Sequence, residues 1–157
     1  MSVVSNGKGS RHNSARPLDP IFNARSVAVI GATENIGAVG RTVLWNLISS
    51  PFGGTVYPVN PKRANVLGIK AYKNIKEIPE KVDLGVICTP AATVPGLVQD
   101  AVDAGMKSLV IISAGFKELG APGIALEKQV QESAVKGNIR IIGPNCLGIQ
   151  NPLIGLN

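Results

Sequence analysis

Short runs of apolar, often β-branched residues alternate along the chain with segments whose apolar residues recur at helical spacing. The runs predict five strands, at residues 26–30, 55–59, 82–89, 107–113 and 139–142. The helical patterns between them predict three longer helices, at residues 39–48, 94–102 and 122–137. Apolar strands that alternate with helices are typical of a parallel sheet covered on both faces. The predicted fold class is therefore α/β, a doubly wound, Rossmann-like parallel sheet.

Two details of the pattern refine this fold. Pro58 lies in the second predicted strand and favours an edge position or a strand end, because proline cannot donate a backbone hydrogen bond. The connection from 60 to 81 is irregular and holds only a short helical candidate around NIKEI. In such a sheet ligands bind outside the carboxyl ends of the strands. Five segments follow predicted strands and are expected to line one crevice: GATENIG, NPKR, CTPAAT, SAGF and GPNCLG.

Length and composition narrow the class of protein. The 157 residues predict a disordered leader at 1–20 and one domain at 21–157. Aromatic residues make up only 4%, which gives no support for nucleic-acid binding by base stacking. No apolar run predicts a membrane span, and the leader lacks the apolar region of a secretory signal. The two cysteines fit no disulfide framework or metal spacing, so we expect a cytoplasmic protein without a metal site.

The charge of the chain is uneven. The formal net charge is +6, and residues 62–81 hold six basic residues against two acidic ones. Such an excess beside a phosphate-binding loop favours an anionic ligand. The alternative is a solvated, lysine-rich face, which stays open for all of these residues except Lys62 and Arg63.

The loops after the first two strands bear on which nucleotide is bound. Gly31, Gly37 and Gly40 lie where the first strand meets the first helix, which lets backbone amides approach a phosphate at the helix N-terminus. The loop is longer than the dinucleotide fingerprint and lacks its second glycine. The second strand ends in VNPKR, where an NAD site would place an acid. Lys62 and Arg63 there favour a ribose phosphate, which leaves NADP or coenzyme A.

Several segments carry a family resemblance: LDPIFNARSVAVIGAT, VYPVNPK, VDLGVICTPA, AGMKSLVIISAGF and GPNCLGI. From about Leu18 to Asn157 the chain resembles the coenzyme A-binding domain of NDP-forming acyl-CoA synthetases, the family of the succinyl-CoA synthetase α subunit. The resemblance implies a function as the module that positions the thiol of coenzyme A. It also implies partner domains or subunits that carry a phosphohistidine and an ATP-grasp fold, and neither is found in this sequence.

The resemblance further implies roles for residues in the matching loops. The pyrophosphate and nearby pantetheine atoms would lie at Gly31, Ala32, Thr33, Ile36 and Gly37. The 3′-phospho-adenosine would meet Val59, Asn60, Pro61, Lys62 and Arg63. The pantetheine channel would be lined by Thr89, Pro90, Ile112 and Ser113, with Asn145 and Cys146 of the GPNC turn towards the thiol. Ala114 stands where the succinyl enzyme has a glutamate, so acyl specificity is expected to differ.

No catalytic residue is expected in this chain. The only histidine, His12, lies in the polar leader and is interpreted as solvated. Cys146 has no histidine to lower its pKa, which favours packing in the turn over a nucleophile. Cys88 is interpreted as a core residue. Three readings besides the synthetase module stay open: a free-standing coenzyme A-binding or sensing protein, the coenzyme A-binding part of a protein acetyltransferase, and an NADP-binding oxidoreductase domain.

Overall fold

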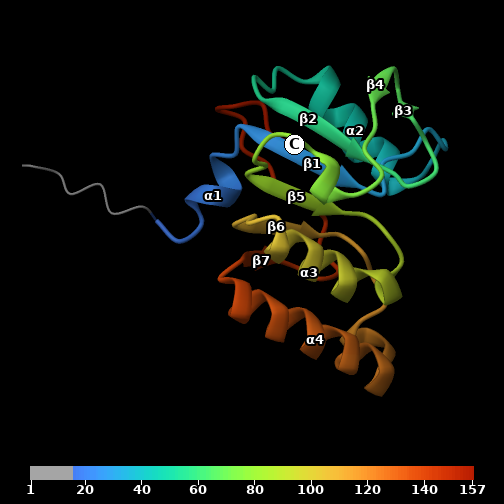
Figure 1. Ribbon diagram of the computed structural model, residues 1–157, viewed down its shortest axis with the longest axis vertical. Coiled ribbons are helices and arrows are strands. Elements are labelled where there is room, and N and C mark those ends of the chain that lie inside the picture. Colours follow the sequence, from blue (N-terminus) through green and yellow to red (C-terminus); the bar gives the residue numbers. More distant parts are fainter. Residues whose placement is uncertain (1–15) are drawn as a thin grey trace, which may run out of the picture.

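The central feature of the protein is a five-stranded parallel sheet (Figure 1). The computed structural model describes residues 16–157. The strands are β1 (Ser26–Ile30), β2 (Thr55–Val59), β5 (Leu84–Ile87), β6 (Ser108–Ile111) and β7 (Arg140–Ile142). They pair in the order β2-β1-β5-β6-β7, and every pairing is parallel. The predicted fold class is confirmed, and the predicted strands 82–89, 107–113 and 139–142 are trimmed at their ends.

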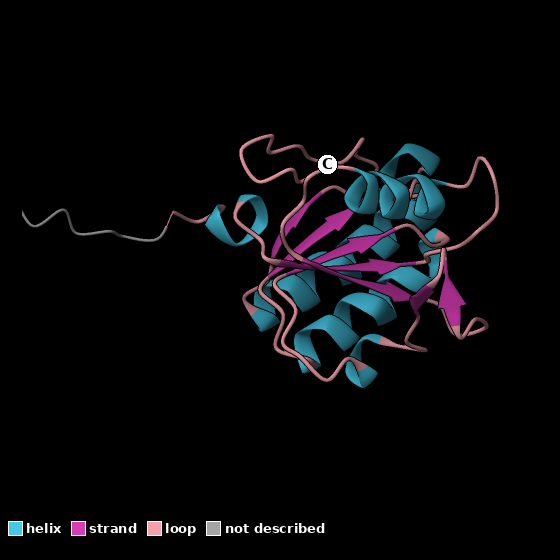
Figure 2. Ribbon diagram, turned by 90° about the horizontal axis from the view of Figure 1, so that it is seen from above, coloured by secondary structure: helices cyan, strands magenta, loops and turns pink. Residues whose placement is uncertain are grey.

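Helices cover both faces of this sheet, as the apolar strands require (Figure 2). One face packs against α2 (Val39–Ser49) and the short α1 (Asp19–Phe22), through residues that include Leu44, Leu47 and Ile21. The other face packs against α3 (Val94–Asp103) and α4 (Ala121–Gly137). Within residues 16–157, three 3₁₀ turns complete the helices: η1 (Ile75–Glu77), η2 (Ala91–Thr93) and η3 (Lys117–Leu119).

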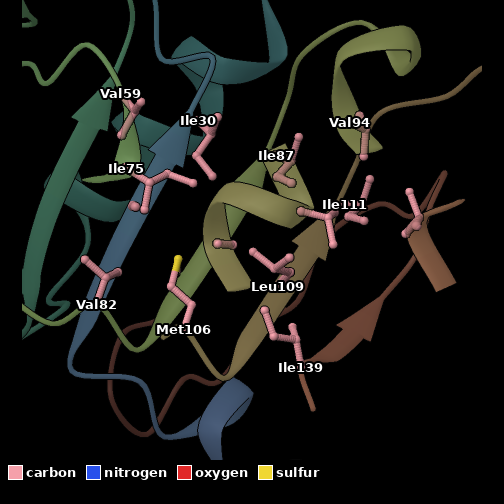
Figure 3. Close-up of a cluster of buried hydrophobic side chains, with 14 of the residues drawn as sticks. Ile30, Val59, Ile75, Val82, Ile87, Val94, Met106, Leu109, Ile111 and Ile139 are labelled. Atoms are coloured by element: carbon pink, nitrogen blue, oxygen red, sulfur yellow. The ribbon is translucent and has the colours of Figure 1, made fainter. Parts of the chain in front are cut away.

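The core under α3 and α4 is built from the branched side chains that identified the strands. Ile30, Ile87 and Ile111, from three neighbouring strands, belong to one buried cluster with Val94 of α3 (Figure 3). Burying such a side chain stabilises the fold by about 1.5–3 kcal/mol. The hydrophobic strand pattern therefore fixes both the sheet and the positions of the loops that follow each strand.

The ends of the elements agree with most of the sequence signals. Pro58 lies in β2, which is an edge strand of the sheet, as expected. Pro122 is in the first turn of α4, and Gly137 is its last residue. Helix α1 includes Asp19 and Pro20, which the sequence had placed in the leader. Residues 1–15 of that leader, with His12, lie outside the described residues.

The connection from β2 to β5 contains an element that the sequence pattern did not predict. Strands β3 (Asn65–Val66) and β4 (Ile69–Lys70) form a small antiparallel hairpin. The hairpin returns to the main sheet where the backbone N–H of Tyr72 donates to the carbonyl of Pro58, at 2.9 Å. The predicted helical turn around NIKEI is present as η1.

The strand order determines where a ligand site is expected. The chain runs from β1 outwards to β2 and then returns to β5, on the other side of β1. Such a reversal is a topological switch point, and the carboxyl ends of β1 and β5 flank it. Within residues 16–157 the structure has no helix that is both long enough and apolar enough to cross a membrane.

Candidate functional site

The loop between β1 and α2 is built around two glycines in close contact. Gly31 has a φ of +93°, and a Cβ added there would lie 2.9 Å from Cγ2 of Thr89 and 3.1 Å from the carbonyl oxygen of Cys88. A Cβ added at Gly40 would meet the carbonyl oxygen of Gly31 at 2.1 Å. The first turn of α2 therefore presses directly on the end of β1. This agrees with the packing role expected of glycine in the loop.

The N-terminus of α2 lacks a side-chain cap. Its N-cap residue, Ala38, makes no side-chain hydrogen bond to the helix. The first N–H groups of a helix have no partner within the helix, and they carry the positive end of its dipole. An uncapped helix N-terminus beside a glycine loop is a site that suits phosphate.

The turn after β2 is hydrogen-bonded to that loop. The side-chain amide of Asn60 donates to the carbonyl oxygen of Ala32 at 2.8 Å, and the N–H of Gly31 donates to the carbonyl of Val59 at 3.0 Å. The amide oxygen of Asn60 accepts the backbone N–H of Lys62 at 2.8 Å. These bonds bring the first two groups of predicted site residues together and fix the direction of the turn.

Arg63, the second predicted cation, is engaged by an acid that the sequence analysis did not consider. Its Nη1 donates to Oε2 of Glu34 at 2.8 Å. Glu34 lies in the first loop, far along the chain from the end of β2 where a carboxylate was looked for. The turn after β2 thus lacks an acid of its own, as expected, yet it receives one from the neighbouring loop.

The predicted residues further along the edge are also adjacent. The backbone N–H of Asn145 donates to the carbonyl of Ser113 at 3.0 Å, and the hydroxyl of Ser113 reaches the carbonyl of Ile87 at 3.4 Å. The hydroxyl of Thr93, in η2, lies 2.8 Å from both Oγ1 of Thr89 and the carbonyl oxygen of Pro90. A row of backbone and hydroxyl groups therefore runs along the carboxyl edge from β1 to β7.

The predicted site residues differ in which of their atoms a ligand can reach. Ala32 is fully buried and Val59 is 3% exposed, so these two residues offer a ligand almost no accessible surface. Ile112 packs partly buried against the core under α2. Ile36 is 92% exposed, at the outer end of the first loop. Thr33, Gly37, Pro61 and Pro90 are partly or fully exposed.

The two cysteines lie near each other under the same edge. Cys146 packs in the GPNC turn, where its Sγ donates to the carbonyl of Ile111 at 3.3 Å. Burial, with a smaller contribution from Cys146, raises the pKa of the Cys88 thiol to about 12. This thiol therefore stays protonated at neutral pH, and the interpretation of Cys88 as a core residue fits its surroundings.

The raised pKa of Cys88 leads to a labelling prediction. In the folded protein at about pH 8, roughly one Cys88 in ten thousand is a thiolate, the form that alkylating agents attack. We expect iodoacetamide to leave Cys88 unmodified in buffer and to alkylate it in concentrated urea, as read by peptide mass spectrometry. Equal labelling under both conditions would contradict the burial of this thiol.

Comparisons with known proteins identify the family of this chain. Residues 25–152 match the family described as the CoA binding domain. The chain belongs to this family. The matched residues include all sixteen predicted site residues, from Gly31 to Cys146.

Similar proteins place this CoA-binding domain within larger ligases. It is 46% identical to the α subunit of an ADP-forming acetate–CoA ligase II of Pyrococcus furiosus, over 89% of this chain and 30% of that one. It is 41% identical to a trans-feruloyl-CoA synthase of an unknown prokaryote, over 91% of this chain and 20% of that protein. A dinucleotide-forming acetyl-coenzyme A synthetase 1 of Ca. Korarchaeum cryptofilum, solved with phosphate and ADP, superposes with a TM-score of 0.85. Its identity is 37%, over 89% of this chain and 30% of that one. The chain thus spans between a fifth and a third of the length of these relatives.

Proposed function

We propose that this domain binds coenzyme A along the carboxyl edge of the sheet. The pyrophosphate lies against the loop from Gly31 to Gly37 and the open N-terminus of α2. The 3′-phospho-adenosine lies at the turn from Val59 to Lys62. The pantetheine arm passes between the loops at Thr89–Pro90 and Ile112–Ser113, and its thiol ends near Asn145 and Cys146.

The turn after β2 is the observation that carries this proposal. Asn60 uses its amide to hold the first loop and to orient the backbone of Lys62. Lys62 is exposed, and among residues 16–157 it has no carboxylate within 4.0 Å. A lysine in this position supplies an unneutralised cation where a dehydrogenase would bind ribose hydroxyls with an acid. Its chemistry fits a phosphorylated ribose.

At the level of the whole enzyme, we propose that the domain serves an ADP-forming acyl-CoA synthetase in the cytoplasm. Its contribution is to hold the thiol in position for acyl transfer, which lowers the entropic barrier to reaction. We assign the phosphohistidine and the nucleotide site of this chemistry to partner domains or subunits, because the one histidine of the sequence, His12, lies outside the residues 25–152 that match the family. Two relatives of 46% and 41% identity are named for acetate and for a feruloyl group, so this domain does not by itself specify the acid.

Calorimetric titration of the 157-residue chain tests the proposal. We expect coenzyme A to bind, and dephospho-coenzyme A to bind about ten- to hundredfold more weakly, because a charge-assisted contact is lost. NADP, whose ribose phosphate is on the 2′ position, is titrated as well, because it is the ligand expected if the chain is an oxidoreductase domain. Equal affinity for the two coenzyme A forms removes the argument from Lys62, and tighter binding of NADP overturns the proposed function.

A further inference from the structure

Glu34 joins three separate parts of the candidate site. One carboxylate oxygen accepts Nη1 of Arg63 at 2.8 Å, and the other accepts the backbone N–H of Leu67 at 3.3 Å. Its backbone carbonyl accepts Nε of Arg41, in the first turn of α2, at 3.1 Å. The residue therefore connects the first loop, the helix N-terminus and the β3–β4 hairpin, which lie together near the carboxyl ends of β1 and β2 (Figure 1).

The hydrogen bond from Leu67 to Glu34 holds the β3–β4 hairpin at its turn, where the backbone conformation is least favourable. Leu67 has a φ of +51° and Gly68 a φ of +78°, so both turn residues are left-handed. The left-handed conformation costs a leucine about 1–2 kcal/mol, unlike a glycine. Val66 is fully buried and Leu67 is partly buried against the same core, and the bond from Leu67 N–H to Glu34 fixes the turn from outside.

The ion pair between Glu34 and Arg63 also leaves the two neighbouring cations, Lys62 and Arg63, in different states. Arg63 has its charge matched by Glu34, and the two side chains are 39% and 41% exposed. Lys62, the preceding residue, has no such partner within the described chain. A phosphate that approaches this turn meets one free positive charge and one neutralised pair.

From these contacts we infer that Glu34 is a positioning residue of the coenzyme A site, an inference that rests on the proposed function. By holding Arg63 and the N–H of Leu67, it fixes residues 60–68 against the first loop. The segment then forms a wall of the adenosine site, with Lys62 directed to the phosphate. Arg63 acts through Glu34 and makes no contact with the phosphate, which replaces its predicted role as a second phosphate cation.

A double-mutant cycle separates these two roles of Arg63. The variants are Glu34→Ala, Arg63→Ala and the double variant, and each is titrated with coenzyme A and with dephospho-coenzyme A. We expect each single change to weaken both ligands by the same factor, about two- to fivefold, since partly exposed ion pairs contribute modestly. The ratio of the two affinities stays as in the wild type, and the double variant is no weaker than either single one.

A direct contact between Arg63 and the 3′-phosphate predicts different changes in affinity. If Arg63 binds the 3′-phosphate, Arg63→Ala narrows the affinity ratio, and Glu34→Ala strengthens coenzyme A binding because it frees the guanidinium. Either result overturns the inference, as does the absence of any effect. Glu132→Ala is the matched control, because it removes an exposed pair with Lys128 on α4 and should leave both affinities unchanged.

Hydrogen exchange gives a readout that does not depend on the ligand. In Glu34→Ala we expect faster amide exchange in residues 65–70, while the exchange of the central strands and the melting temperature stay near the wild-type values. Unchanged exchange in the hairpin overturns the positioning role. A wild-type chain that binds no coenzyme A would instead refute the proposed function, and the exchange experiment would still decide whether Glu34 holds the hairpin.

Discussion

Replacing Gly40 by alanine is expected to lower the free energy of unfolding by about 2–3 kcal/mol, the upper part of the range for an overpacked site. The added Cβ would lie 2.1 Å from the carbonyl oxygen of Gly31 and 2.9 Å from its carbonyl carbon. Neither atom can rotate away, because both belong to the backbone at the end of β1. Helix α2 must therefore move away from the sheet, and the proposed pyrophosphate site opens with it.

Two measurements check this expectation. Urea denaturation should show a lower midpoint for Gly40→Ala, and calorimetry should show coenzyme A affinity reduced by at least about tenfold, as for the loss of a charge-assisted contact. Gly96→Ala is the control, since Gly96 lies within α3 and a Cβ there meets nothing within 4 Å. Alanine should stabilise that exposed helical position by about 0.5–1 kcal/mol. A Gly40→Ala protein as stable as the wild type would show that the two backbones can separate without cost.

The main sheet could be predicted because the hydrophobic period acts locally. Each strand is a short apolar run, each long helix has an apolar stripe, and Pro58 restricts its strand to an edge. Once the strands are parallel, the loops at their carboxyl ends must meet at one edge. The adjacency of Gly31, Asn60 and Thr89 therefore followed from topology alone.

The β3–β4 hairpin could not be predicted in the same way. Two-residue hairpin turns are recognised by residues that accept a positive φ, such as Asn-Gly, whereas this turn is Leu67–Gly68. The leucine is held in place by burial and by Glu34, which are tertiary contacts. A strand of two residues is also too short to show a period.

The pairing of Arg63 was missed for a related reason. An acid was looked for after β2, because that is where a dinucleotide site places it along the chain. Glu34 reaches the same space from the loop after β1, 29 residues away. The charges of the turn could be counted from the sequence, but the neutralisation of Arg63 by Glu34 of the neighbouring loop could not.

Lys62→Ala is expected to weaken coenzyme A binding by about ten- to hundredfold, the effect of losing a hydrogen bond to a charged group. Binding of dephospho-coenzyme A should change by less than about twofold, since no phosphate faces the missing ammonium. The change leaves the turn intact, because Asn60 holds residue 62 through its backbone N–H. Calorimetric titration of both ligands measures the difference directly.

Lys81→Ala is the matched control for this experiment. Lys81 belongs to the same basic stretch, but it lies with Arg25 and Lys107 around a cavity at the amino ends of the strands, opposite the proposed site. It removes the same formal charge, so any loss of affinity in this variant measures the general attraction of a basic protein for an anion. If the two lysine variants bind coenzyme A equally well, the phosphate is not recognised at the end of β2. If only Lys62→Ala loses the preference for coenzyme A over dephospho-coenzyme A, Lys62 alone binds the 3′-phosphate. The role of Arg63, which is neutralised by Glu34, is then to support the wall of residues 60–68 that positions Lys62.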